Sequence, residues 1–240
     1  MTALIKHDDH TQNSPTFVFM YCDHKFVIKG GDIYKVPNIK AALDRNVTIA
    51  LPQVNRNVNS DEILDILSVY PKFIAYLEQT SEFCLAAVRK NGLLITHIKV
   101  QSPEICLEAV SNNSLSLLYV EEQTPEICMA AVRKNGLALR FVKEQTLELC
   151  WAAVDQNAWA IIYVKNQTSR LCLTAVKTNG LTLEYVKDQT PEICMTAVRN
   201  SGHALRYAKV QTPALCLAAV QKDATAIQFV RDKSMVAQIA

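Results

Sequence analysis

The sequence lacks long hydrophobic runs, and it has few glycines and no excess of either charge. No apolar stretch approaches the roughly 18 residues that cross a bilayer, and the N-terminal residues lack the apolar core of a signal peptide. We therefore expect no membrane segment. Only six glycines occur, and they form no phosphate-binding loop. A formal net charge of +2 excludes a strong general attraction to nucleic acids, so any basic patch must be local.

Patterns typical of catalysis or metal binding are also lacking. The chain has no pair of cysteines at CxxC spacing, and none of its five histidines belongs to a recognisable nucleophile or metal-ligand pattern. The segment His7–His10, together with Cys22 and His24, could collect a metal, but we interpret such binding as adventitious. We predict no catalytic residue, no resident metal, no cofactor and no enzymatic activity.

The dominant feature that is present is a repeat of 22 residues without insertions. Half of all residues are apolar, so the chain can bury a core. A contiguous repeat of this length is typical of a solenoid, in which each unit buries its apolar face on its neighbours. Seven units cover residues 79–232, and each begins with a glutamine, which we number position one: Gln79, Gln101, Gln123, Gln145, Gln167, Gln189 and Gln211.

The first half of each repeat predicts a short helix. Thr or Ser at position two is a typical N-cap, and Pro follows it in four repeats, where a missing N–H has no cost. The apolar residues at positions five, six, seven, nine and ten then share one helical face. Asn followed by Gly, as at Asn135 and Gly136, predicts that a left-handed residue ends the helix.

The second half predicts another short helix, with positions eighteen, twenty-one and twenty-two left to solvent. The rival interpretation is a strand and an α/β horseshoe, because Leu137, Leu139 and Phe141 alternate. Val142 breaks that alternation where a leucine-rich repeat would carry Asn or Cys. We therefore predict an all-α fold: an α-solenoid of seven helix-turn-helix repeats with degenerate terminal repeats.

The ends of the chain depart from the repeat. Residues 57–78 fill one degenerate capping repeat, and residues 233–240 form a truncated C-terminal repeat or cap. Residues 1–56 form an N-terminal extension. Within it, Thr16–Cys22 and Lys25–Lys29 predict the two strands of a small β-hairpin cap, and we expect residues 1–14 to be disordered.

Two segments carry a family resemblance. Leu85–Leu93 and Met129–Phe141 share the pattern A-A-V-x-x-N-G-L, extended by A-L in the second segment. This pattern resembles a short α-helical repeat family of unknown function that occurs in giant DNA viruses and some intracellular bacteria. The resemblance covers roughly residues 60–232, although that family's units are usually longer, with a charged segment that is absent here. It implies a helical, viral or bacterial protein and no known activity.

Cysteine occupies position six in every repeat. Stacked helices lie about 8–10 Å apart, which exceeds the Cα separation of about 7 Å that a disulfide tolerates, so neighbours cannot pair. We interpret the column as small apolar side chains in a structural ladder, kept reduced inside a cell, and place the protein in the cytoplasm, the host's if it is viral. The column consists of Cys84, Cys106, Cys128, Cys150, Cys172, Cys194 and Cys216.

Three more sets of residues, each at an equivalent position of successive repeats, are candidates for a structural or a binding role. The amides at positions one and thirteen stand beside turns, where we expect them to satisfy backbone groups rather than read bases. The aromatic or histidine side chains at position nineteen could stack on bases, but we interpret them as core. A basic column at position twenty-one supports the alternative of nucleic-acid binding through phosphates: Lys99, Lys143, Lys165, Lys187, Lys209 and Arg231.

Among the solvent-facing positions eighteen, twenty-one and twenty-two, position eighteen varies most between repeats. Leu118 and Ile162 are apolar at this position, which we expect to be exposed to solvent, and this suggests a contact patch. We therefore predict a scaffold that binds a protein or peptide through this column, with end-to-end homodimerisation as a further alternative. The predicted partner-binding residues are Thr96, Leu118, Arg140, Ile162, Glu184, Arg206 and Gln228.

Overall fold

The computed structural model describes four strands near the N-terminus, residues 63–65, 67, 71, 74 and 77, and the continuous stretch 79–237. The chain forms two compact units, residues 1–112 and 113–240, and each is described by itself. None of the helices in the described part is long and apolar enough to span a bilayer.

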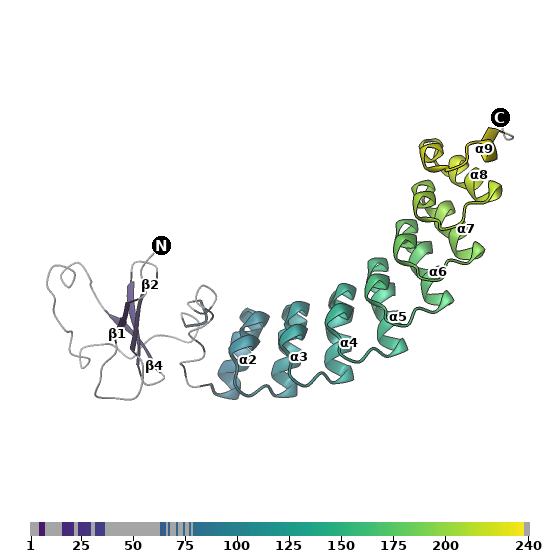
Figure 1. The fold of residues 1–240 in the computed structure, drawn as a ribbon. Helices are drawn as coiled ribbons and strands as arrows, with labels where there is room; N and C mark the ends of the chain where they lie inside the picture. The colour runs from purple at the N-terminus through teal and green to yellow at the C-terminus, as the bar shows by residue number, and fades with distance from the viewer. Residues whose placement is uncertain are drawn as a thin grey trace. The chain divides into compact units, whose positions relative to one another are not determined.

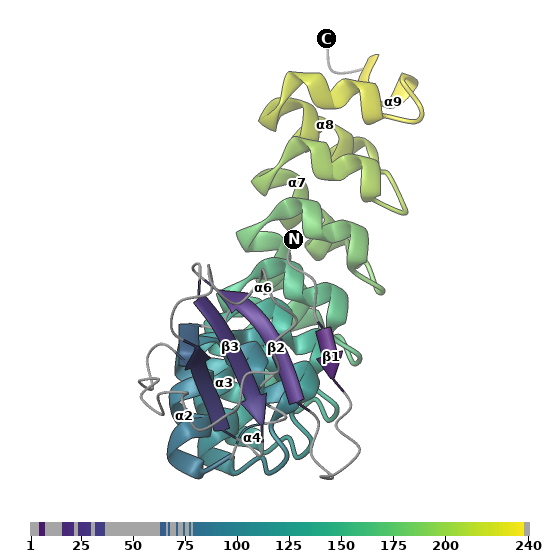
Figure 2. The same ribbon diagram turned by 90° about the vertical axis from the view of Figure 1, so that its left-hand side faces the viewer.

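The N-terminal strands form one antiparallel sheet in the order β1-β2-β3-β4. The predicted hairpin corresponds to β2 and β3, which pair with Val18 opposite Val27 and lie side by side in Figure 2. Two further strands, β1 and β4, extend the hairpin on either side. Strand β1 contradicts the expected disorder for its three residues, and the rest of 1–14 lies outside the described residues. The bounds are Ile5–His7, Thr16–Tyr21, His24–Lys29 and Asp32–Val36.

The first unit also contains the start of the repeat array. Helix α2 spans Ser81–Lys90, the 3₁₀ helix η3 spans Gly92–His97, and α3 spans Pro103–Asn112. In the segment that precedes them, Leu64, Leu67, Ile74 and Leu77 are buried. Lys90 of α2 forms an ion pair of 2.8 Å with Asp65.

The second unit is an all-α solenoid in which α-helices alternate with 3₁₀ helices and successive repeats pack on one another (Figure 1). The predicted fold class is therefore confirmed. The α-helices are α4 (Pro125–Lys134), α5 (Leu147–Gln156), α6 (Ser169–Thr178), α7 (Pro191–Asn200), α8 (Pro213–Lys222) and α9 (Ser234–Ala237). The 3₁₀ helices are η4 (Ser114–Tyr119), η5 (Gly136–Phe141), η6 (Ala158–Tyr163), η7 (Gly180–Tyr185), η8 (Gly202–Tyr207) and η9 (Ala224–Phe229).

Helices α2 to α8 each begin directly after the predicted cap. In α4, the Thr124 hydroxyl accepts a hydrogen bond from the N–H of Ile127, and Pro125 occupies the first helical position. The buried side of the helix carries positions five, six, nine and ten, for example Ile127, Cys128, Ala131 and Val132. These side chains form the core between repeats.

The second element of each repeat is a 3₁₀ helix, whereas the sequence pattern predicted a short helix without specifying its type. Only six residues separate the asparagine that precedes η5 from the extended Val142 that follows it. In so short a segment the i to i+3 pattern closes one more hydrogen bond than the α-helical pattern would, which favours the tighter helix. Asn135 caps it, because its side chain accepts from the N–H of Leu137 at 3.0 Å.

The glycine at position fourteen does not end the α-helix in the predicted left-handed conformation. Asn135 makes the turn in an extended conformation, with φ of −154°. Gly136 is needed for a different reason, since a Cβ there would stand 2.3 Å from the carbonyl oxygen of Ala153 in the next repeat. Gly180 meets Ala197 at the same 2.3 Å, and Gly202 meets Ala219 at 2.5 Å. The glycine therefore permits close approach of consecutive repeats.

A clamp from the following repeat accompanies this close approach. The N–H of Gly136 donates to the side chain of Gln156 at 2.6 Å, and the N–H of Gly180 donates to Asn200 at 2.7 Å. The Asn200 amide also donates to the carbonyl of Lys177. Position fourteen carries Ser114, Ala158 and Ala224 in the other repeats of this unit.

Candidate interaction face

The glutamine at position one ties neighbouring repeats together through their backbones. The Gln167 Nε2 group donates to the carbonyl of Ile161 at 3.1 Å in the preceding repeat and to Tyr185 at 3.0 Å in its own. Its Oε1 atom accepts from the N–H of Lys187 at 3.0 Å. The same contacts recur at Gln123, Gln145, Gln189 and Gln211, so this column serves the framework.

The cysteines lie inside the framework beside these glutamines. All seven are buried free thiols. The Cys172 Sγ atom lies 3.6 Å from Oε1 of Gln167, and Cys128, Cys150 and Cys194 make the equivalent contact at 3.8 Å. Burial raises the pKa of the Cys172 thiol, which keeps it protonated and unreactive while the repeat is folded.

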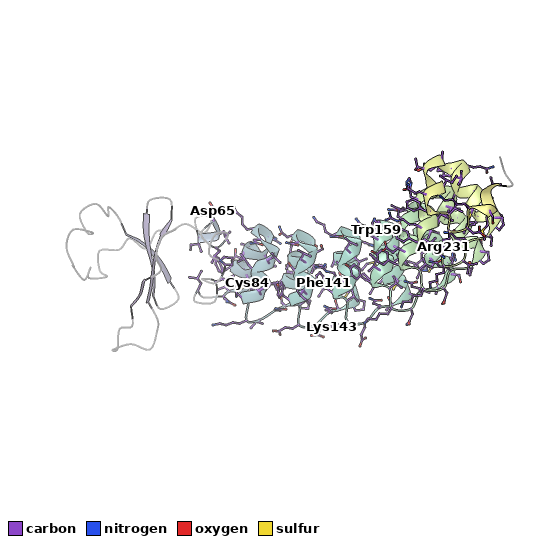
Figure 3. All side chains as sticks on the ribbon, turned by 45° about the horizontal axis from the view of Figure 1, so that its top comes forward. Asp65, Cys84, Phe141, Lys143, Trp159 and Arg231 are labelled. Carbon is purple, nitrogen blue, oxygen red and sulfur yellow. The ribbon has the colours of Figure 1, made fainter. Side chains whose placement is uncertain are left out.

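The basic side chains at position twenty-one turn back to the chain itself. Lys165 donates from Nζ to the carbonyl of Lys143 at 2.9 Å, and Lys187 donates to Lys165 at 2.8 Å. Lys209 and Arg231 continue this pattern, and Figure 3 shows Lys143 extending from the edge of its repeat. Each of these four cations thus binds the backbone carbonyl of position twenty-one in the preceding repeat, two residues beyond the end of that repeat's 3₁₀ helix.

The 3₁₀ helices present an exposed face, which we call the 3₁₀ face: positions fifteen, eighteen and nineteen of η4 to η9. A 3₁₀ helix has three residues per turn, so positions fifteen and eighteen lie above one another on one side. All seven predicted residues at position eighteen are exposed. Leu118 exposes 52% of its surface and Ile162 exposes 38%, so both apolar side chains meet solvent.

The aromatic column at position nineteen is only partly core. None of its seven side chains is fully buried, and Tyr119 and Tyr185 are 44% and 37% exposed. The interpretation of the column as core was therefore wrong in this respect.

Rings and charges on the 3₁₀ face contact one another both within a repeat and between neighbouring repeats. Trp159, labelled in Figure 3, meets Tyr185 of the next repeat edge to face at a centroid distance of 5.9 Å. The Arg140 guanidinium lies 4.2 Å from the centroid of Phe141, and Arg206 lies 4.4 Å from that of Tyr207. These cation–π contacts hold the arginines over the aromatic column, and Arg206 also donates a hydrogen bond to the Tyr207 hydroxyl.

A polar cluster joins the last two repeats. His203 Nδ1 lies 2.8 Å from a carboxylate oxygen of Asp223, and the other oxygen accepts from the Thr225 hydroxyl at 2.7 Å and from its N–H at 3.0 Å. Asp223 occupies position thirteen, where five other repeats carry asparagine. Hydrogen bonds from Thr225, with a smaller effect of His203, hold the pKa of Asp223 below its ordinary value.

We expect this lowered pKa to make the last repeat sensitive to acid. A carboxylate with a depressed pKa contributes stability that is present above its unfolded pKa, about 4, and is lost as pH falls through the folded value. Asp223→Asn keeps the cap that other repeats use. The wild type should exceed this variant in melting temperature near neutral pH, and the difference should shrink below about pH 4. Circular dichroism melts would measure it, and a difference independent of pH would contradict it.

In the described part of the chain, no group of three or more His, Cys, Asp or Glu side chains is placed to hold a metal ion. Of the N-terminal cluster, His7 and His24 lie in β1 and β3, and His10 and Cys22 lie outside the described residues. One group of framework residues was missed by the sequence interpretation: the amides at position twelve, whose side chains accept from the N–H of the glycines in the preceding repeats. Asn112, Gln156 and Asn200 recur at every second repeat, and this spacing is the signal that could have revealed them.

The chain matches a protein-family model in part of its length. The family model of a domain of unknown function (DUF4116) matches residues 102–147 and 170–211, and each matched segment spans about two consecutive repeats. No curated protein and no solved structure matches the chain.

Proposed function

We propose that the protein is a non-enzymatic scaffold that binds another protein through the 3₁₀ face. The observation that carries this proposal is the contrast between a uniform framework and a varied exposed column. Glutamine, cysteine and the capping residues repeat in the same contacts, whereas position eighteen offers leucine, arginine, isoleucine, glutamate and glutamine to solvent. Variation that leaves the packing unchanged is what a recognition surface on a repeat array requires.

Exposed apolar side chains support the choice of this face. Leu115, Leu118 and Tyr119 are all exposed on η4, and Ile162 and Tyr185 continue the apolar character on η6 and η7. Apolar side chains grouped on one face are typical of protein-binding surfaces. The alternative of nucleic-acid binding is less well supported, because the position twenty-one cations of this unit donate to backbone carbonyls. In addition, Glu121 interrupts this basic column at position twenty-one, and Glu184 places a negative charge at position eighteen.

Charge placed on the 3₁₀ face should abolish partner binding without unfolding the protein. The combined variant Leu118→Asp and Ile162→Asp changes two exposed side chains, so its circular dichroism spectrum and melting temperature should match those of the wild type. Recovery of specific partners in a pull-down should fall at least roughly tenfold, as expected when contact residues of an interface are lost.

Leu147→Asp is the matched control, because Leu147 is at least as accessible as Leu118 and Ile162, at 56%, but lies at the start of α5 outside the 3₁₀ face. This control should retain every partner. Unchanged recovery of all partners by the Leu118 and Ile162 variant would refute the assignment of the face.

A further inference from the structure

The 3₁₀ face carries a ladder of partly exposed rings with one rung per repeat. Tyr163, Tyr185 and Tyr207 follow one another at position nineteen of consecutive repeats. Position fifteen adds Trp159 against Tyr185 and His203 against Phe229, the latter at a centroid distance of 5.4 Å. A ligand that runs along the array therefore meets a ring at each repeat.

The spacing of this ladder selects one peptide conformation. Packed helices generally lie about 8–10 Å apart, and we expect equivalent rings of neighbouring repeats at a similar separation. A polyproline II helix advances about 3.1 Å per residue with three residues per turn, so it presents the same side every ~9.3 Å. A β-strand repeats each side after about 6.6 Å, and it falls out of register after one repeat. Of these two conformations, only the polyproline II helix repeats at a distance inside the range of about 8–10 Å between packed helices.

The chemistry of these aromatic side chains agrees with a polyproline II ligand. A polyproline II segment makes no internal hydrogen bonds, so its carbonyls stay free to accept. The Trp159 indole N–H and the Tyr207 hydroxyl, which accepts from Arg206 and keeps its own proton to donate, stand at the edges of apolar rings, which suits both proline side chains and peptide carbonyls. Aromatic-lined surfaces recognise proline-rich segments in this way in other peptide-binding domains.

We propose that the 3₁₀ face binds a proline-rich segment of its partner in the polyproline II conformation, with one turn of the ligand per repeat. The proposal rests on the proposed function and specifies the partner's chemistry. It also goes further, because a matched pitch fixes which ligand residue faces each repeat.

In this arrangement the side chain at position eighteen of each repeat faces every third residue of the ligand and favours one of complementary charge or polarity. Arg140, Ile162, Glu184 and Arg206 occupy four consecutive repeats, and all four are exposed. The ligand should place an acidic residue opposite Arg140, an apolar residue opposite Ile162, a basic residue opposite Glu184 and an acidic residue opposite Arg206. The mixed signs of this column favour a peptide over a polyanion, which would meet Glu184 at the centre.

The test uses the full-length protein and fluorescently labelled synthetic peptides. Glu-Pro-Pro-Ile-Pro-Pro-Lys-Pro-Pro-Glu carries the predicted register, and its reversed sequence covers the opposite chain direction. A peptide with glycine in place of every proline keeps the charges but loses the preformed conformation. We expect the better of the two proline peptides to bind at least roughly tenfold more tightly than its glycine counterpart in anisotropy titrations.

Charge reversal tests the register itself. The variant Glu184→Lys should weaken binding of the lysine peptide by about fivefold, the size expected for an exposed ion pair, and a peptide with Glu in place of Lys should restore it. Arg170→Glu, an exposed charge on α6 outside the 3₁₀ face, should change nothing. Equal binding of proline and glycine peptides, no rescue by the exchanged charge, or preference for a single-stranded oligouridine would each overturn the proposal.

These results separate the proposal from the function on which it rests. If proline peptides fail while the Leu118 and Ile162 variant still loses its natural partner, the face binds protein but the partner is not a polyproline II segment. If that variant keeps every partner and proline peptides also fail, both proposals are wrong.

Discussion

Replacing Gly180 with alanine is expected to destabilise the second unit by about 3 kcal/mol, although alanine is the better helix former. The added Cβ would stand 2.3 Å from the carbonyl oxygen of Ala197, a backbone atom that cannot rotate away. To relieve this contact α7 must move, and the hydrogen bond of 2.7 Å from the Gly180 N–H to Asn200 is strained as well. The intrinsic preference for alanine, about 1 kcal/mol, is too small to offset these losses.

The measurement is urea unfolding followed by circular dichroism, combined with thiol labelling. Cys172 and Cys194 lie in the two repeats that Gly180 joins and are buried, so they react only when these repeats open. Their labelling rates in Gly180→Ala should rise roughly a hundredfold, in proportion to the lost stability. The opposite change at the equivalent position, Ala158→Gly, is the matched control and should cost only about 1 kcal/mol. A neutral or stabilising effect of Gly180→Ala would contradict the close approach of repeats.

Replacing Gln167 with leucine should cost about 2–4 kcal/mol, because it removes three backbone hydrogen bonds with little change of volume. The carbonyls of Ile161 and Tyr185 and the N–H of Lys187 would lose their partner in a region that is only partly open to water. The N–H of Lys187 should then exchange with deuterium much faster than in the wild type.

Hydrogen exchange with mass spectrometry would localise this change to the end of η7, and urea unfolding would give its size. Gln221→Leu, at an exposed position of α8, is the matched control and should lie within about 0.5 kcal/mol of the wild type. If the two leucine variants unfold at the same urea concentration, the glutamine column does not hold the repeats together.

Much of this architecture follows from the sequence because its signals are local. The Thr124 cap, the Pro125 start and the apolar positions of α4 all act within one helix, so their pattern predicts that helix directly. The exposure of position eighteen follows from the same periodicity. The glutamine column was predicted for a similar reason, since an amide at a turn has backbone groups within reach.

The remaining features depend on contacts between repeats, which a single repeat does not encode. A segment of six residues is too short to separate a period of 3.0 from one of 3.6, so the 3₁₀ form of η5 was not predicted. Gly136 resembles an ordinary helix end until the carbonyl of Ala153 is placed beside it. The turn of Lys165 toward the carbonyl of Lys143 likewise requires the neighbouring repeat.

The most direct test of the central claim, that the 3₁₀ face is the binding surface, is site-specific photo-crosslinking in the native cell. A photoreactive residue would replace Ile162 on η6 in one variant and Lys134, an exposed residue at the end of α4, in another. We expect a discrete protein adduct from position 162 that is absent from position 134. Adducts of equal yield from both positions, or from position 134 alone, would contradict it.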